Sequence, residues 1–329
     1  DLLKDVVKNI REEIKSLGGE VHFSSKVEKI EYEDGKLKYI VVNGEKRPCQ
    51  ALVLAIGHSS RDTYEMLNDI GIFMEPKAFA IGVRIEHPQE MINVGQYGKM
   101  TSHPRLQAAS YNLTYQSKSL GRGIYSFCMC PGGVVVAAAS EENRLVSNGM
   151  SYHARDKENS NSALVVTVAP DDFEGNSVLR GMEFQRYYEG LAYKVGGGGY
   201  KAPVQLLGDF INDRKSTKLG GVTPSYEPGF EFTDMRQCLP SYVVDAIKEG
   251  VGNFDRKIKG YGREDAILTG IETRTSAPVK ITRNERLESI SLSGLYPCGE
   301  GAGFAGGIVS AAVDGIKVAE RIIEKYYYS

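Results

Sequence analysis

Near its C-terminal end the chain carries five glycines within nine residues, in the stretch Leu295-Tyr296-Pro297-Cys298-Gly299-Glu300-Gly301-Ala302-Gly303-Phe304-Ala305-Gly306-Gly307. The apolar residues before the glycines predict a strand, and those after them recur at helical spacing. Because glycine has no Cβ, a strand-to-helix turn built from it lets a ligand lie directly against the main chain. The stretch therefore predicts a site for a flat or anionic ligand.

The spacing Gly301-x-Gly303-x-x-Gly306 matches the fingerprint that opens a dinucleotide-binding Rossmann unit, but it lies too late in the chain for that role. Only 23 residues follow Gly306, which is room for one helix but not for the next strand and its ribose-binding acid. The turn is therefore expected to close a nucleotide-binding fold whose opening βα unit precedes Asp1. The closing helix is expected to bury Ile308, Ala311, Ala312, Ile316, Ala319, Ile322 and Ile323.

A second strand-and-glycine segment lies earlier in the chain. Residues 51–56 form a continuous apolar run, Ala-Leu-Val-Leu-Ala-Ile, which ends in Gly57-His58-Ser59-Ser60. A run that is apolar throughout is typical of a central parallel strand buried on both faces. Ligands bind outside the carboxyl ends of such strands, so the segment that starts at Gly57 is expected at a ligand-binding end of the sheet.

The first 50 residues predict a helix followed by strands. Apolar residues recur at helical spacing from Leu2 to Leu17 and stop at Gly18-Gly19, which indicates a glycine-terminated helix. Residues 21–50 then predict a short strand and a meander, because Asp34-Gly35 and Asn43-Gly44 are both hairpin turn dipeptides.

After Pro76 the pattern changes to longer strand-like segments at 79–85, 125–130, 134–138 and 163–168. Apolar residues from Leu239 to Ile258 outline an amphipathic helix that contains Gly250 and Gly252. The last residues return to strand, turn and helix. The sequence thus predicts a first part (1–75), an inserted mixed α+β domain (76–264) and a closing part (265–329).

Composition limits the classes of function. Apolar residues make up 41% and charged residues 25%, as in soluble globular proteins, and the formal net charge of -2 disfavours a main role in binding nucleic acid or membranes. No apolar run approaches the roughly 20 residues that span a bilayer. The five cysteines form no C-x-x-C pair, so we expect neither a metal site nor a secreted disulfide framework. This pattern predicts a cytoplasmic location. The absent initiating Met suggests that the chain begins inside a longer protein.

Four segments together resemble a known family. They are Val53–Ser59, Phe127–Gly133 (Phe-Cys-Met-Cys-Pro-Gly-Gly), Gly270–Ser276 and the turn at Gly299-Glu300. The sequence resembles the two-domain FAD oxidoreductases related to glutathione reductase, and most closely their uncharacterised FAD-dependent dehydrogenases. The resemblance implies an α/β fold, with an FAD/NAD(P)-binding Rossmann-like domain made from both ends of the chain and interrupted by a substrate domain.

The resemblance also implies roles for particular residues. Glu300 falls where an acid lies near the ribityl chain and pyrophosphate of FAD, and Gly306, Gly307 and Ile308 fall where a helix N-terminus faces the pyrimidine edge of the flavin. Such a helix end stabilises negative charge on reduced flavin. Val27 falls where the main chain contacts adenine. The full set of implied cofactor-binding residues is Val27, Gly57, Gly299, Glu300, Gly301, Gly303, Gly306, Gly307 and Ile308.

The glycine loop and ribose acid that bind the ADP half of FAD have no counterpart in this chain, so the chain alone is expected to hold FAD weakly or not at all. The class uses NAD(P)H or an organic substrate as electron donor. We expect a small-molecule substrate.

Four side chains are candidates for catalysis. Cys128 and Cys130 could form a redox pair, although cysteines two apart on a strand also share a face and simply pack. Arg274 could hold an anionic substrate, or it could be a surface strand arginine in a salt bridge. His58 could donate a proton, or only a structural hydrogen bond.

Two other functions stay open from the sequence. One is a flavin-dependent RNA-modifying enzyme, which would call for a basic groove that the near-neutral charge disfavours. The other is a non-catalytic binding fragment.

Overall fold

The computed structural model describes residues 2–327. The chain divides into two compact units, the first made of Asp1–Lys77, Asn176–Leu179 and Ser276–Ser329, and the second of Ala78–Gly175 and Arg180–Thr275. The boundaries expected at 75/76 and 264/265 lie two and eleven residues before those of the structure. The larger difference arises because strand β14 (Ile267–Glu272) is hydrogen-bonded inside the sheet of the second unit.

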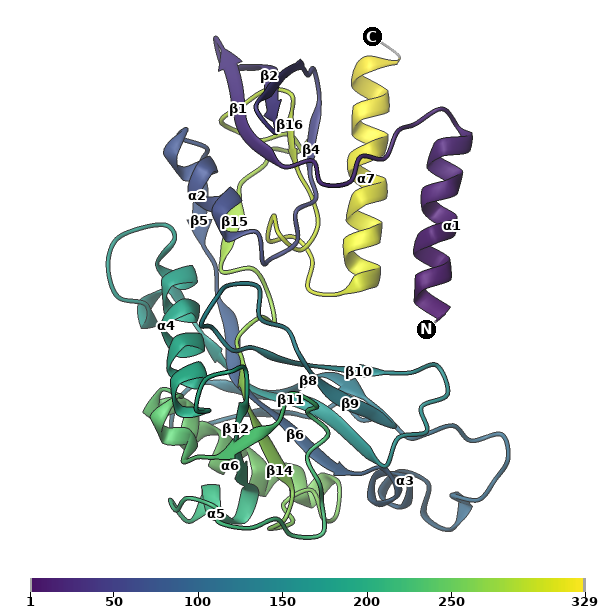
Figure 1. Cartoon of the computed structure of the whole chain (residues 1–329), viewed down its shortest axis with the longest axis vertical. Coiled ribbons are helices and arrows are strands. Elements are labelled where there is room, and N and C mark those ends of the chain that lie inside the picture. Colours follow the sequence, from purple (N-terminus) through teal and green to yellow (C-terminus); the bar gives the residue numbers. More distant parts are fainter. Residues whose placement is uncertain (1, 328–329) are drawn as a thin grey trace. The chain divides into compact units, whose positions relative to one another are not determined.

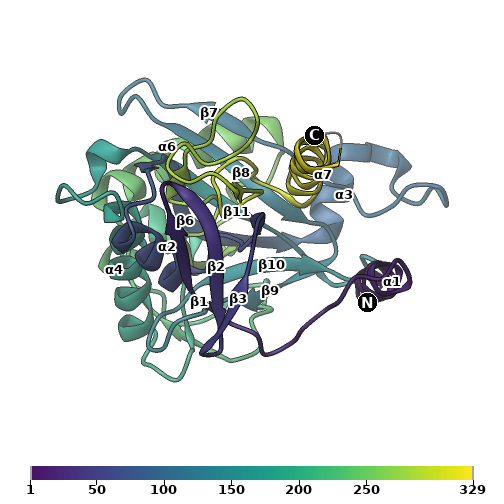
Figure 2. The ribbon, with the colours of Figure 1, turned by 90° about the horizontal axis from the view of Figure 1, so that it is seen from above.

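The first unit contains the predicted meander (Figure 1, Figure 2). Strands β1 (Val27–Glu33), β2 (Lys36–Val42) and β3 (Glu45–Pro48) form an antiparallel sheet in that order. Both connecting turns have positive φ at their two central residues, 51° and 69° at Asp34 and Gly35 and 49° and 81° at Asn43 and Gly44. Asx-Gly turns of this kind match the twist of the paired strands, which is why the dipeptides predicted them.

Two short strand pairs complete the strands of this unit. Strand β4 (Leu52–Leu54) pairs in parallel with β16 (Leu295–Pro297), and β5 (Met74–Pro76) pairs antiparallel with β15 (Val279–Ile281). Helix α2 (Arg61–Asp69) follows β4. The parallel pairing makes the carboxyl ends of β4 and β16 coincide.

The prediction that β4 is a central strand buried on both faces is wrong. In the described residues β4 pairs with β16 alone, and the Val53 side chain is 42% exposed. Residues 21–26, expected to start with a short strand, form none.

The two long helices of this unit leave most of their apolar side chains in water. Helix α1 (Leu2–Ser16) stops just before Gly18 (φ 84°), as predicted, but none of its residues is buried. In helix α7 (Ile308–Tyr326) only Asp314 and Val318 are buried. The expected buried side of α7 is therefore wrong; its members are exposed or half-buried, namely Ile308, Ala311, Ala312, Ile316, Ala319, Ile322 and Ile323.

The second unit is built on a seven-stranded mixed sheet. Its strand order is β13-β12-β14-β6-β11-β8-β7, in which only β12 and β13 are parallel neighbours. The remaining bounds are β6 (Phe79–Pro88), β7 (Thr114–Gln116), β8 (Gly123–Cys130), β11 (Asn159–Val168), β12 (Ala202–Leu206) and β13 (Phe230–Phe232), with β9 (Gly133–Ala137) and β10 (Ser147–Ser151) as a separate hairpin. The helices are α3 (Gln89–Tyr97), α4 (Arg180–Val195), α5 (Leu207–Ile211) and α6 (Ser241–Lys257), with short 3-10 turns at Gly98–Met100, Pro170–Asp172 and Met235–Gln237.

The colours in Figure 1 show that β6, from the first third of the chain, lies between β11 and the much later β14. The predicted strands near 79–85, 125–130, 134–138 and 163–168 are confirmed as β6, β8, β9 and β11. The predicted amphipathic helix is confirmed as α6, continuous through both glycines. A Cβ on Gly250 would lie 2.7 Å from Cγ2 of Ile124, so glycine lets α6 approach strand β8 closely.

Candidate functional site

The carboxyl ends of β4 and β16 bring the two glycine segments of the first unit into direct contact. The Cys298 N–H donates to the Leu54 carbonyl oxygen at 3.0 Å, which continues the strand pairing to the last residues of both strands. Beyond it, a Cβ on Gly301 would lie 2.4 Å from the carbonyl oxygen of Gly57. Only glycine fits at position 301, because any side chain would overlap this neighbouring backbone.

Tyr64 of helix α2 holds the two glycine segments together through its hydroxyl group. Its side chain is fully buried, and its hydroxyl donates to the Gly301 carbonyl oxygen at 2.8 Å and lies 3.4 Å from that of Gly57. Burial, and then the nearby charge of Glu300, raise the pKa of the Tyr64 hydroxyl, so it remains a neutral donor. Tyr64 was not predicted from the sequence, where its signal was its place in the helix that follows Gly57.

Glu300 and His58 meet at the end of the two strands. The Glu300 Oε1 lies 2.9 Å from the His58 Nδ1, and the two side chains are 29% and 19% exposed. The sequence indicated both residues separately but not their pairing. Together they place a carboxylate and an imidazole, both able to contact a ligand's hydroxyl groups, beside bare main chain.

Asp314 holds the glycine turn against helix α7. Its Oδ2 accepts a hydrogen bond from the Gly299 N–H at 2.7 Å, and the Arg283 guanidinium contacts both carboxylate oxygens at 2.6 and 2.9 Å. Burial acts to raise the pKa of Asp314, but Arg283 and the Gly299 N–H outweigh it and leave the pKa below its usual value. Asp314 was not predicted from the sequence; the signal was a charged residue within the mostly apolar first half of α7.

The N-terminus of α7 is open to solvent. Gly306, Gly307 and Ile308 are exposed, and no side chain caps the helix. A Cβ on Gly306 would meet nothing within 4 Å. The first-turn N–H groups and the positive end of the 19-residue helix are therefore available to a ligand.

Gly303 lies in the left-handed region, with φ of 84°, and its Cβ would lie 2.7 Å from the Val279 carbonyl oxygen. The turn thus needs glycine at 301 and 303 for its own packing, whereas the glycines at 306 and 307 leave open space. Open main chain at a helix N-terminus fits the flat, partly anionic ring system of a flavin.

Val27 lies at a cavity of the first unit, away from the glycine turn. This cavity of about 210 Å³ is lined by Lys26, Val27, Glu28, Asp62, Thr63 and Met66. The Lys26 ammonium pairs with the Asp62 carboxylate at 2.7 Å. No residue of the glycine turn lines this cavity.

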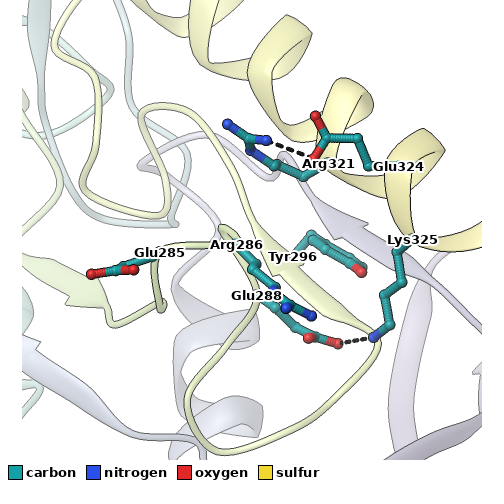
Figure 3. Close-up of a pocket in the computed structure, with 7 residues that line it drawn as sticks. All are labelled: Glu285, Arg286, Glu288, Tyr296, Arg321, Glu324 and Lys325. Carbon is teal, nitrogen blue, oxygen red and sulfur yellow. Dashed lines mark hydrogen bonds and ion pairs between the residues drawn. The ribbon is translucent and has the colours of Figure 1, made fainter.

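A second cavity of the first unit, of about 580 Å³, lies between α7 and the segment before β16 (Figure 3). Three acids and three bases line it together with Tyr296, and two pairs among them are already joined, Lys325 with Glu288 at 2.7 Å and Arg321 with Glu324 at 2.6 Å. Its charges largely compensate one another, and none of the expected cofactor residues lines it.

In the second unit Arg274 is not a surface arginine. It is 6% exposed, and its guanidinium lies 3.2 Å from the fully buried Glu189 carboxylate and donates to the Ser140 hydroxyl at 2.6 Å. Thr273 donates to the same carboxylate at 2.7 Å. The buried ion pair neutralises the charge of Arg274 and fixes the end of β14.

Cys128 and Cys130 lie on β8, beside a second buried ion pair. The Arg84 guanidinium, which is fully buried, pairs with Glu272 at 2.9 Å and donates to the Cys128 carbonyl oxygen at 2.9 Å. Cys128 is exposed and Cys130 is buried. Cys128 also lines a surface cavity of about 460 Å³, together with residues 110–112 and 125–129 of the same unit. The Arg84–Glu272 pair was not predicted from the sequence.

Across residues 2–327, no three His, Cys, Asp or Glu side chains cluster as a metal ion would require. Within that same range no helix combines the length and apolar character needed to cross a membrane.

Two solved structures are remote likenesses of the chain. CtdE in complex with FAD is 12% identical with a TM-score of 0.34, over 94% of this chain and 57% of CtdE. An oxidoreductase from Methanosarcina mazei is 14% identical with a TM-score of 0.38, over 96% of this chain and 54% of that one. With scores this low neither structure carries an argument about this chain.

Comparison of sequences is more informative. An uncharacterized protein of Clostridium beijerinckii is 74% identical over 326 residues, which are 99% of this chain but 61% of that protein. The chain therefore spans about three-fifths of its relative's length. The family described as FAD-dependent protein, C-terminal domain-like, matches residues 78–275, more than half of the chain. This chain belongs to the FAD-dependent protein, C-terminal domain-like family.

Proposed function

We propose that the chain is part of an FAD-dependent oxidoreductase in which the flavin ring lies against the main chain from Gly299 to Gly307. The observation that carries the proposal is the uncapped, exposed N-terminus of α7, directly after a glycine turn at the carboxyl ends of two parallel strands. The family to which the chain belongs supports a flavin-dependent function in general.

The flavin, when bound, supplies the transfer of hydride or electrons. The chain supplies position and charge: the N–H groups and the dipole of α7 favour negative charge at the ring edge next to Gly307. Glu300 and His58 accept or donate hydrogen bonds to the polar groups of the cofactor's side chain. Tyr64 and Asp314 are positioning residues, because they hold Gly301 and Gly299 rather than the ligand.

We further propose that the first unit is an incomplete Rossmann-like FAD-binding domain and the second unit an inserted substrate domain. The exposed apolar face of α1, the exposed Val53 and the unpaired edge of the β4–β16 sheet support this. In the longer relative, additional residues would complete the sheet and bring the glycine loop that binds the ADP half of FAD. Val27 would contact the adenine.

The proposed electron donor is a nicotinamide or a small organic molecule, and cytoplasm is the proposed location. None of the four candidates for catalysis is assigned as acid or base.

A titration with FAD tests this function. The Clostridium beijerinckii relative is expected to bind FAD, with absorption bands near about 370 and 450 nm, and to be reduced under anaerobic conditions by NADH, NADPH or a small metabolite. This chain is expected to bind FAD at least about tenfold more weakly, since losing the diphosphate contacts costs more than about 1.4 kcal/mol. A relative that stays colourless after addition of FAD would rule out the proposal.

A further inference from the structure

The backbone of β8 departs from a regular strand at Cys128. In the pairing with β11, Cys130 lies opposite Asn161 and Phe127 opposite Ala163, so three steps along β8 match two steps along β11. The extra residue makes a β-bulge. Cys128 has φ of 46°, in the left-handed region that residues other than glycine rarely adopt.

This bulge changes what two cysteines in a C-x-C segment can do. On a straight strand, the Cβ atoms of residues two apart point to the same face and are separated by about 6.6 Å. A disulfide needs its two Cβ atoms within about 4.5 Å. A straight strand therefore keeps such thiols apart. The bulge fits three steps of β8 opposite two steps of β11, and the Cys130 Sγ lies 3.3 Å from the carbonyl oxygen of Cys128.

The bulge is held in place by buried groups of the same unit. Arg84 Nη1 donates to the Cys128 carbonyl oxygen at 2.9 Å, and the same guanidinium contacts Asn161, Asn148 and Glu272. Because Arg84 is fully buried and anchored on three elements, its hydrogen bond ties the unusual backbone at the exposed Cys128 to the folded core.

The two thiols differ in accessibility and character. Cys128 is exposed at the surface cavity lined by residues 110–112 and 125–129, whereas Cys130 is 6% exposed. A hydrogen bond to the Cys128 side chain, and then burial, raise the pKa of the Cys130 thiol. The difference in accessibility suits the exposed Cys128 to attack a small disulfide first and the buried Cys130 to resolve the adduct.

We propose that Cys128 and Cys130 form a redox-active dithiol that closes reversibly into a disulfide by exchange with a low-molecular-weight disulfide. The Cys128 thiolate attacks one sulfur of the small disulfide, forms a mixed disulfide and releases one thiolate. Cys130 then attacks the Cys128 sulfur, and the second thiolate leaves. The two protons lost by the cysteines protonate the two released thiolates, so the pair loses two electrons and the small disulfide gains them. This exchange does not depend on a flavin.

Thiol mapping in glutathione redox buffers tests the proposal. The reduced chain is equilibrated in buffers of rising oxidised glutathione, quenched with acid, unfolded, alkylated with iodoacetamide and mapped by mass spectrometry. We expect one transition in which the peptide containing both cysteines loses two hydrogens and takes up no alkyl group. Cys49, in the first unit, is expected to remain alkylated and serves as the internal reference.

Variants separate the two roles. The variant Cys130→Ser is expected to accumulate glutathione on Cys128. The variant Cys128→Ser is expected to accumulate none on the buried Cys130. The matched control, Cys49→Ser, is expected to titrate like the unsubstituted chain. The same titration in urea is expected to give an equilibrium constant for ring closure at least about tenfold smaller, because the unfolded segment lacks the bulge.

Two results would overturn the proposal, and both are read on the unsubstituted chain without relying on any variant to fold. One is a stable glutathione adduct on Cys128, or complete alkylation of both cysteines, at every buffer ratio. The other is an equal closure constant in the folded and the urea-unfolded chain.

Discussion

At the scale of single residues, the glycines of the terminal turn divide into two kinds. Gly301 and Gly303 are needed by the protein itself, because a Cβ on either would overlap a neighbouring carbonyl oxygen. Gly306 and Gly307 have open space around them. The sequence could count all of them, but only the structure separates those that pack from those that present bare main chain.

The substitution Gly301→Ala is expected to lower the free energy of unfolding by about 1–3 kcal/mol, because the new methyl group would overlap the Gly57 carbonyl. Gly315→Ala is the matched control: it lies inside α7, its Cβ would meet nothing within 4 Å, and it is expected to stabilise by up to about 1 kcal/mol. Urea denaturation measures both. Equal effects of the two substitutions would contradict the close contact at Gly301.

His87 gives the chain a defined sensitivity to acid. It is fully buried in β6, and burial lowers the pKa of its imidazole from 6.5 to about 4. Between pH 6.5 and about 4, the imidazole is protonated in the unfolded chain but not in the folded chain. The free energy of unfolding therefore falls as the pH drops through this window. From this group alone, the chain is expected to be about 2 kcal/mol less stable at pH 5 than at pH 7.

Urea denaturation at the two pH values checks this expectation. His87→Gln is expected to remove that part of the loss, and His103→Gln, at an exposed histidine, is expected to leave it unchanged. The account of His87 fails if the pH dependence of His87→Gln equals that of the unsubstituted chain.

At the scale of elements, local signals predicted most helices and strands. The Asx-Gly dipeptides predicted the meander, and the glycines after Leu17 predicted the end of α1, because positive φ is a property of a few residues. Burial was predicted less well. Three predictions failed: the buried face of α7, the central position of β4 and the strand near residue 21. Each of them needs a neighbouring strand or helix to pack or pair with, and the described part of the first unit contains none in those places.

Helix α1 is expected to be weakly stable in this chain. It has 15 residues and none is buried, and an isolated helix of this length is marginal in water. Hydrogen exchange read by mass spectrometry is expected to find the α1 amides at least about tenfold less protected here than in the longer Clostridium beijerinckii relative, where we propose that further residues cover its apolar face. Similar protection in both proteins would mean that nothing covers α1 in the relative.

At the scale of the whole molecule, the candidate site is assembled from segments far apart in the sequence. Tyr64 and Gly301 are 237 residues apart, and Arg283 reaches Asp314 from another segment. The sequence could name Gly57, His58 and Glu300 from the pattern around them, but a buried tyrosine or aspartate carries no local signal of its partner. For the same reason the Arg84–Glu272 pair, 188 residues apart, was not predicted.

The central claim is that flavin lies on the bare main chain at the start of α7, and Gly307→Val tests it most directly. Position 307 is exposed, its backbone is extended and its Cβ would come no nearer than 3.9 Å to another group, so valine fits without a clash and the variant is expected to fold. The affinity for FAD is expected to fall at least about tenfold, because the branched side chain occupies the ligand's contact surface. Fluorescence titration measures this affinity in this chain and in the longer relative with the matching change. Undiminished affinity for FAD in a folded Gly307→Val variant would contradict the account.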